Sequence, residues 1–250
     1  MAEQEIVKHT KKVYKIWNSK EHGFWFKLKE FLIEILIIVF AVSLSIWLHE
    51  RSEHATQQQE VKEFLTGLRQ DLLSDLREIS DDRKSYVLQQ QAFGYISGIR
   101  IQDPINRDSL EKYKKPLLNI TRLQQNNGRF EGFKASGKIG AIENNVLQDH
   151  IMDLYQENIP SLLSSTDNYI RRKNQLIDFY IFHLKRFTDT TSNAATILKM
   201  DEAQNLAGFL ARPDEIIERY DSCISKMTTI VEEIENKYGI KKNNKQKDHL

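Results

Sequence analysis

The sequence contains few of the residues that build disulfide-linked or turn-rich folds. Its single cysteine, Cys223, excludes an intrachain disulfide and any multi-cysteine zinc or redox site. Only four prolines and ten glycines occur in 250 residues, whereas sandwiches and barrels need frequent turns. Leu, Ile, Glu, Lys and Gln, which favour long helices, are abundant. The composition therefore predicts an all-α protein.

An excess of charge of one sign is also missing. The chain has 36 basic and 35 acidic residues, and its net charge is +1. Such a chain has no global field that would attract a polyanion. We therefore expect no nucleic-acid partner.

One long hydrophobic run is present, FLIEILIIVFAVSLSIWL at residues 31–48. As a helix it covers about 27 Å, close to the hydrocarbon thickness of a bilayer. A buried helix of a soluble protein usually keeps a polar stripe, but Ile35 to Ala41 is apolar on every face. This run predicts a single transmembrane helix. A cleaved signal peptide is the alternative, although Ala41-Val42-Ser43 matches a cleavage site only weakly.

Basic residues predict the orientation of this helix. Six lysines, at positions 11, 12, 15, 20, 27 and 29, precede the run, and only Arg51 and Lys62 follow it closely. The positive-inside rule places residues 1–30 in the cytosol as a basic arm. Apolar residues among the arm's lysines also predict a short helix at the membrane surface.

Glu34 lies in the first turn of the hydrophobic run, where an ionised carboxylate is costly. Two interpretations remain open. It lies at the inner headgroup boundary near Lys27 and Lys29, which we favour, or it serves as a proton relay or a contact with a partner helix.

Residues 49–238 form the predicted soluble domain, with three long amphipathic helices. The first continues the membrane helix as a stalk and is followed by shorter helices near residues 108–120 and 201–211. Apolar residues at steps of three or four mark the first long helix: Val61, Leu65, Leu68, Leu72, Leu76, Ile79, Tyr86 and Phe93. The second pattern includes Leu147, Ile151, Leu154, Leu162, Ile170, Ile177, Tyr180, Leu184 and Phe187.

The third long helix begins at Pro213-Asp214, ends at Gly239 and has the cleanest heptad pattern. Its apolar positions are Ile217, Tyr220, Ile224, Met227, Val231, Ile234 and Tyr238. Together the helices predict an antiparallel bundle with an intrachain core. A dimer or trimer that uses the same stripe is the alternative. Residues 239–250 are predicted to be a disordered tail.

Two features interrupt the helical pattern. Pro160 predicts a kink or break in the second long helix. The segment Asn126 to Gly140 holds four glycines, so we expect a turn-rich connection with about one helical turn around Phe133.

Part of that glycine-containing segment, Gly132 to Lys138, matches the first seven positions of a phosphate-binding P-loop. The eighth position is Ile139 instead of Ser or Thr, and no apolar strand precedes Gly132. Ser136 also lacks the context of a nucleophile elbow. We therefore expect turns here, and no nucleotide.

The remaining polar candidates have simple structural interpretations. We interpret His49, Glu50, Glu53 and His54 as a hydrated collar beside the membrane. His150 and Asp153 share a helix face, His183 is packed or exposed, Cys223 is a small buried thiol, and Arg171-Arg172-Lys173 beside Tyr169 is a solvated face. The sequence thus predicts no catalytic residue, no cofactor site and no metal site.

Two stretches resemble a family of uncharacterised single-pass envelope proteins found mainly in Bacteroidota. The first is the anchor, with Glu34 at its entrance, Ile35 to Phe40, Ala41, and Glu53 after the polar exit. The second runs from Phe133 through Ser136-Gly137-Lys138-Ile139 to Asn144, with Leu147, Ile151 and Tyr155 following. The family's glycine before the entrance Glu is Ile33 here, and its Asn-Asn-Trp exit is His49-Glu50-Arg51. The resemblance implies a bacterial inner membrane protein with a periplasmic domain. Because the family has no assigned activity, the resemblance does not indicate a reaction.

The sequence leaves two main hypotheses for function. The first is a non-enzymatic structural or interaction module of the cell envelope, which contacts lipid and either another envelope protein or a second copy of itself. The alternative is a periplasmic sensory or ligand-binding module, in which a continuous stalk passes a shift through the membrane. An enzyme would need a convergent cluster that linear sequence does not reveal.

Overall fold

The structure is a computed structural model that describes residues 24–100, 107–188 and 192–239, together with Lys11, Tyr14, Gln102 and Pro104. The chain divides into two compact units, Met1–Glu60 and Val61–Leu250. Helices account for nearly all regular structure in the described residues, with one isolated antiparallel bridge between Arg186 and Ser192. The prediction of an all-α fold is confirmed.

The first unit contains the beginning of α2, a helix of 74 residues that runs from Phe24 to Ser97. An 18-residue window of α2 has a mean hydropathy of 2.6, and only 6% of that window is buried. The helix is thus long and apolar enough to span a membrane, as residues 31–48 predicted. The expected surface helix of the arm lies outside the described residues, apart from Lys11 and Tyr14.

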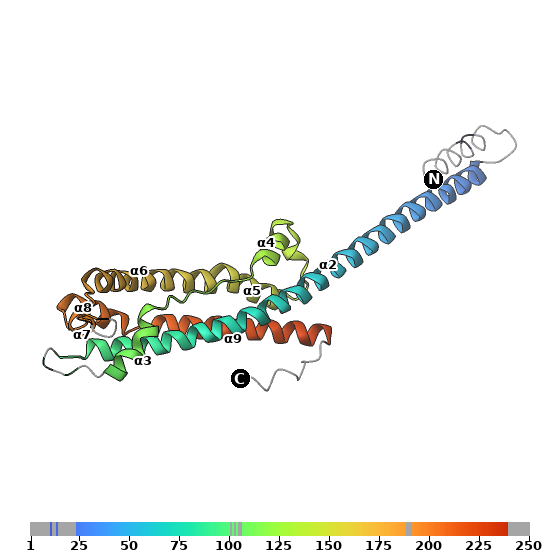
Figure 1. The fold of residues 1–250 in the computed structure, drawn as a ribbon. Coiled ribbons are helices and arrows are strands. Elements are labelled where there is room, and N and C mark those ends of the chain that lie inside the picture. Colours follow the sequence, from blue (N-terminus) through green and yellow to red (C-terminus); the bar gives the residue numbers. More distant parts are fainter. Residues whose placement is uncertain are drawn as a thin grey trace. The chain divides into compact units, whose positions relative to one another are not determined.

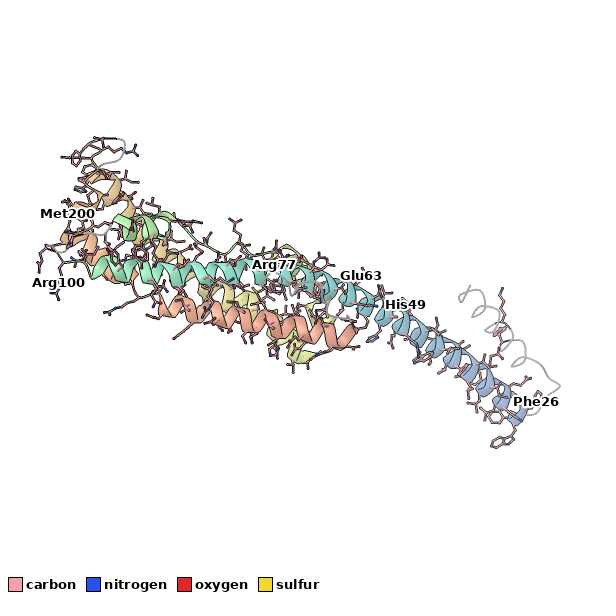
Figure 2. The ribbon with its side chains drawn as sticks, turned by 60° about the horizontal axis from the view of Figure 1, so that its bottom comes forward. Phe26, His49, Glu63, Arg77, Arg100 and Met200 are labelled. Atoms are coloured by element: carbon pink, nitrogen blue, oxygen red, sulfur yellow. The ribbon has the colours of Figure 1, made fainter. Side chains whose placement is uncertain are left out.

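The second unit is a helical bundle built on the remainder of α2 (Figure 1). Figure 1 shows α6 and α9 running alongside this part of α2, with α7 and α8 gathered where α2 ends. In Figure 2, Arg100 and Met200 mark this same end of the bundle. The helices that follow α2 are α3 (Arg107–Leu118), α4 (Gly128–Ala135), α5 (Asn145–Asp153), α6 (Ile159–His183), α7 (Ala194–Ile197), α8 (Asp201–Leu210) and α9 (Asp214–Tyr238).

The apolar stripe of α2 forms one side of the core. Seven of its eight predicted positions are buried, and Leu76 is partly buried against them. The opposing side comes from α5, α6, α8 and α9, with residues such as Leu147, Leu162, Leu210 and Tyr220. From Val61 onward, α2 therefore provides one side of the bundle core.

Helices α2 and α9 are antiparallel and tied by polar pairs at heptad intervals. Arg69 bonds Glu235, Arg83 bonds Asp221, and Gln90 donates to Asp214. Arg69 and Arg83 are two heptads apart, as are Asp221 and Glu235, and one further heptad leads to Gln90 and Asp214. A constant 3.5-residue period on both helices is the packing geometry of a coiled coil.

A segment without regular secondary structure, residues 119–127, connects α3 and α4 and is held by side chains of α2. The carboxylate of Asp75 accepts from the backbone N–H of Asn126, and that of Glu78 accepts from the N–H of Gln124. The hydroxyl of Tyr86 donates to the carbonyl of Thr121. These bonds satisfy backbone groups that lack a partner strand or helix.

The glycine-containing segment is more helical than the sequence predicted. Residues 128–135 form α4, and Lys138–Ala141 form a 3-10 helix, η1. Phe130 is fully buried and stacks on Tyr155, while Phe133 stacks on Phe64 at a centroid distance of 3.9 Å. The expectation of a single helical turn was wrong because this aromatic packing outweighs the low helix propensity of glycine.

The break predicted near Pro160 is confirmed just before that residue. A π-helical segment, η2 (Leu154–Asn158), separates α5 from α6, and Pro160 lies in the first turn of α6. A proline in a first turn leaves no intrahelical bond unmade there. The predicted end of the last helix is also confirmed: Gly239 has a φ of 61° and ends α9.

Candidate functional site

A cavity of about 270 Å³ lies between α2 and α3, and we call it the α2–α3 cavity. Leu88, Tyr113 and Pro116 provide its apolar surface. The described residues that line it include two lysines and no acidic residue: Ser85, Leu88, Gln89, Gln91, Lys112, Tyr113, Lys115, Pro116 and Asn119. The cavity thus combines apolar surface with positive charge.

Lys173, on α6, lies behind the wall of this cavity and is 1% exposed. Its ammonium donates to Gln89 Oε1 at 2.7 Å, to the carbonyl of Pro116 at 2.8 Å, and to the carbonyl of Asn119. It also lies 5.7 Å from the ring centroid of Phe93. The three acceptors all belong to residues that line the cavity.

The end of α3 explains why a lysine is held at this position. Helix α3 finishes at Leu118, so its last carbonyls have no intrahelical donor. A cation near a helix C-terminus also interacts favourably with the helix dipole. Burial lowers the pKa of Lys173 to about 7, because desolvation penalises the charged amine.

Gln89 is the polar group that Lys173 orients. An ammonium group only donates, so the amide atom that faces it must be the oxygen. The Nε2 of Gln89 is therefore directed elsewhere, and it has no acceptor within the described part of the chain. With Gln89 only 2% exposed, this donor is buried and unsatisfied, which costs free energy.

A second hollow, which we call the α6–α8 groove, has a volume of about 930 Å³. Phe182 in this groove is 85% exposed. Three further exposed apolar side chains, Ile181, Phe187 and Phe209, belong to the same helices or follow α6 directly. The described lining contains two carboxylates and no Lys or Arg: Gln175, Asp178, Phe179, Phe182, His183, Glu202, Asn205 and Leu206.

The P-loop-like stretch is divided between two helices. Gly132 to Ala135 belong to α4, and Lys138 begins η1. The N–H of Ser136 bonds the carbonyl of Gly132, and that of Gly137 bonds the carbonyl of Lys134. The hydroxyl of Ser136 donates to the carbonyl of Phe133. These donors are committed within the chain, so the stretch does not form a phosphate cradle.

The basic run was partly misassigned from the sequence. Arg171 and Arg172 are exposed, as expected for a solvated face, but Lys173 is buried. Lys173 belongs to the buried stripe of α6, with Leu162, Thr166, Tyr169 and Leu176. The solvated interpretation of Lys173 was wrong. The spacing of Tyr169, Lys173 and Leu176 is the signal that indicates its burial.

The histidines in the described residues have local partners. His49 pairs with Glu53 at 3.3 Å and both are exposed, in agreement with a hydrated collar. His150 faces Glu233 of α9, while Asp153 binds Lys226 at 3.1 Å. The Nδ1 of His183 lies 2.9 Å from the carbonyl of Phe179. Within the residues that the structure describes, no three His, Cys, Asp or Glu side chains are grouped to hold a metal ion.

Two further residues that the sequence singled out, Cys223 and Glu34, are buried in the structure. Cys223 is buried in the core, as expected for a structural thiol, and burial raises its pKa to about 11. A raised pKa keeps the thiol protonated and unreactive. Glu34 is 7% exposed in the first unit, so its carboxylate is sheltered. Its assignment to a headgroup boundary, a proton relay or a helix contact stays a prediction.

Comparisons with protein-family models, curated proteins and solved structures find no match to this chain. The resemblance to the Bacteroidota envelope proteins therefore stays a prediction. The cavity, the groove and the long apolar stretch of α2 are the features of the described residues that bear on function.

Proposed function

We propose that this protein is a membrane-anchored interaction module, in which a helical bundle on a single transmembrane helix binds a partner protein of the bacterial cell envelope. The excess of lysines before residue 31 supports a cytosolic N-terminus and a periplasmic bundle. The resemblance to inner-membrane proteins of Bacteroidota supports the same topology.

The observation that carries this proposal is the exposed aromatic surface on α6, on α8 and just after α6, of which Phe182 lines the α6–α8 groove. Phe182 buries little of its ring, and Phe187 and Phe209 are more than half exposed. Large apolar side chains gathered on a surface are a common mark of a protein-binding site, because a partner removes them from water. These rings are not among the buried residues of the core.

Charge indicates what kind of partner segment fits the groove. Asp178 and Glu202 line it without an ion pair to any described residue, and His183 is its one basic side chain. A segment with apolar side chains and at least one Lys or Arg complements this lining in both respects. We therefore expect a partner that inserts an apolar, basic helix or loop.

Site-specific crosslinking in intact cells tests this function. A photoreactive amino acid replaces Phe182, and the full chain is then purified in mild detergent. We expect one defined adduct, which mass spectrometry assigns to a partner. Unlabelled protein with Phe182→Ser should compete poorly for formation of this adduct. The control places the same photoreactive residue at Glu218, an exposed position on α9, where we expect no such adduct.

The possible results separate the alternatives. An adduct between two copies of the chain would identify the partner as the protein itself. A solitary monomer with no adduct at position 182 would contradict the proposal.

Ligand binding is a second candidate function, and the α2–α3 cavity favours it. This cavity adjoins α2, the helix that also contains the membrane-spanning stretch. A sensory role requires a cytosolic partner for residues 1–30, so a pull-down with that arm that recovers nothing would weaken it.

A further inference from the structure

We propose that the α2–α3 cavity is a binding site for a small organic anion, specifically a monocarboxylate with a compact aromatic or aliphatic body. This inference deepens the second candidate function and does not depend on the α6–α8 groove. It rests on the charge, the unsatisfied donor and the size of the cavity.

The charge of the cavity selects an anion. Lys112 and Lys115 line it, and neither forms an ion pair within the described part of the chain. Lys173 adds a third amine behind the wall, where it donates to the cavity-lining residues Gln89 and Pro116. No described carboxylate lies within ion-pair distance of this amine. Positive groups around a partly enclosed, low-dielectric space raise the local concentration of small anions.

The unsatisfied amide donor of Gln89 suits an anion that has oxygen acceptors, as a carboxylate does. Lys173 holds the oxygen of Gln89, so that the amide nitrogen remains as a donor without an acceptor. Gln89 lines the cavity, and we assign its buried, unsatisfied Nε2 as the donor to a carboxylate oxygen, while Lys112 and Lys115 neutralise the charge. Lys173 already donates to three acceptors, so we assign it the role of a positioning residue for Gln89.

The dimensions of the cavity limit the ligand. A volume of about 270 Å³ lies just below the usual range for drug-sized ligands, roughly 300–1,000 Å³. Tyr113 provides a flat apolar surface. Its ring contacts that of Tyr95, with 5.2 Å between the two centroids. Leu88 and Pro116 complete this surface. Benzoate and short fatty acids match these limits.

The position of Lys173 also predicts a coupling between binding and protonation. Its pKa is lowered by burial to about 7, and an anion nearby stabilises its charged form and so raises that pKa. Carboxylate binding at pH 8 should therefore take up protons from solution. No carboxylate belongs to the described cavity lining, and Gln89, Pro116 and Asn119 face the amine with neutral groups.

Calorimetry on the full chain in detergent micelles tests the site. The probes are acetate, hexanoate and benzoate, each compared with its neutral amide, in two buffers of different ionisation enthalpy at pH 8. We expect at least one carboxylate to bind more than tenfold more tightly than its amide, with proton uptake. The α3 double variant Lys112→Gln/Lys115→Gln should weaken that binding about tenfold. Lys62→Gln/Lys84→Gln, which removes equal charge from α2 at positions that do not line the cavity, should change it less than twofold.

Gln89→Leu tests the donor separately, with circular dichroism as a check on folding. Because the exposed Lys112 and Lys115 do not support the core, their variant remains informative if Gln89→Leu fails to fold. Equal binding of carboxylate and amide, an unaffected lysine double variant, or no binding of any of the three acids would overturn the proposal. Phe182→Ser should leave carboxylate binding unchanged, so the groove and the cavity can fail independently.

Discussion

The two parts of α2 use apolar residues in opposite ways. In residues 31–48 nearly every side chain is apolar and most are exposed, with Leu36 at 68%. From Val61 onward apolar residues occupy one face, and Leu68 is fully buried. Both parts are continuous α-helix. Thus the distribution of apolar residues around the helix, rather than helix formation, separates a segment suited to lipid from one suited to a protein core.

Charged residues differ between the two parts in the same way. Glu34 is the one charged residue between Phe31 and Leu48, whereas the second part uses Arg69, Asp75 and Arg83 to bind other elements of the bundle. Polar groups there flank the apolar stripe and specify register. The second part of α2 therefore needs its neighbours, and the first part is suited to an apolar solvent.

The largest effect is expected from charges placed in the first part. Each arginine near the middle of a membrane helix costs about 2.5–3.5 kcal/mol of insertion free energy. The double variant Val39→Arg/Val42→Arg should therefore move the protein from the membrane pellet to the soluble fraction after carbonate extraction. Gln57→Arg, at an exposed position of the same helix, should leave it in the pellet. Retention of the double variant in the membrane would contradict a spanning role.

The same truncation in the two parts should have unequal effects on the bundle. Leu68→Ala creates a cavity in the core and should lower the free energy of unfolding by about 2–5 kcal/mol. Leu36→Ala should change it by less than about 0.5 kcal/mol, because that side chain does not contribute to the bundle core. Chemical denaturation in detergent, followed by the near-ultraviolet signal of the buried tyrosines, measures both. Similar losses for the two variants would remove the distinction.

The ion pairs between α2 and α9 should differ in their contribution to stability according to their burial. The Arg69–Glu235 pair is 16% and 8% exposed, whereas Arg83–Asp221 is 35% and 52% exposed. Glu235→Gln leaves Arg69 with a weaker partner in a buried setting and should cost about 2 kcal/mol. Asp221→Asn should cost only about 0.5 kcal/mol, since water screens the exposed pair. Equal costs, measured by denaturant unfolding at low and moderate salt, would disagree with this ranking.

A smaller and pH-dependent effect is expected at Asp82. Burial, reinforced by Glu78, raises the pKa of Asp82 to about 6. The folded state therefore binds more protons than the unfolded state between about pH 4 and 6, and stability from this group falls as pH rises through that window.

Asp82→Asn should thus stabilise the bundle by about 1 kcal/mol at pH 8, since the Asn amide is uncharged and its oxygen still accepts from Tyr220. The gain should be smaller at pH 4.5, because the carboxyl of Asp82 is already mostly protonated in the folded state at that pH. Thermal unfolding at the two pH values measures this difference. A gain that is larger at pH 4.5 than at pH 8 would show that the folded carboxylate is not disfavoured.

Much of the fold could be predicted because local rules and packing agree. Gly239 ends α9, Asp214 begins it, and the stripe of α2 is buried as its spacing indicated. In α6 and α9 the predicted stripe was displaced by one residue at several positions. In α9, Ile216 and Cys223 are buried where Ile217 and Ile224 were expected to be. A wide apolar face allows either assignment until the partner helix is known.

The candidate site could be predicted far less well. Lys173 looked solvated because it follows two arginines, and its acceptors come from residues 54–84 positions away in the chain. Two of those acceptors are backbone carbonyls, which leave no trace in residue identity. The amphipathic pattern predicted which surfaces meet, but the cavity depends on how α3 terminates against α2 and α6.

The pairing of Arg69 with Glu235 has a consequence for how the bundle can be modified. Because α9 ends beside the place where α2 enters the second unit, the chain enters and leaves this unit at the same end, and the α6–α8 groove lies at the opposite end. A reporter protein joined after Tyr238 would therefore be attached away from the groove. Such a fusion would label the base of the bundle while leaving the α6–α8 groove uncovered.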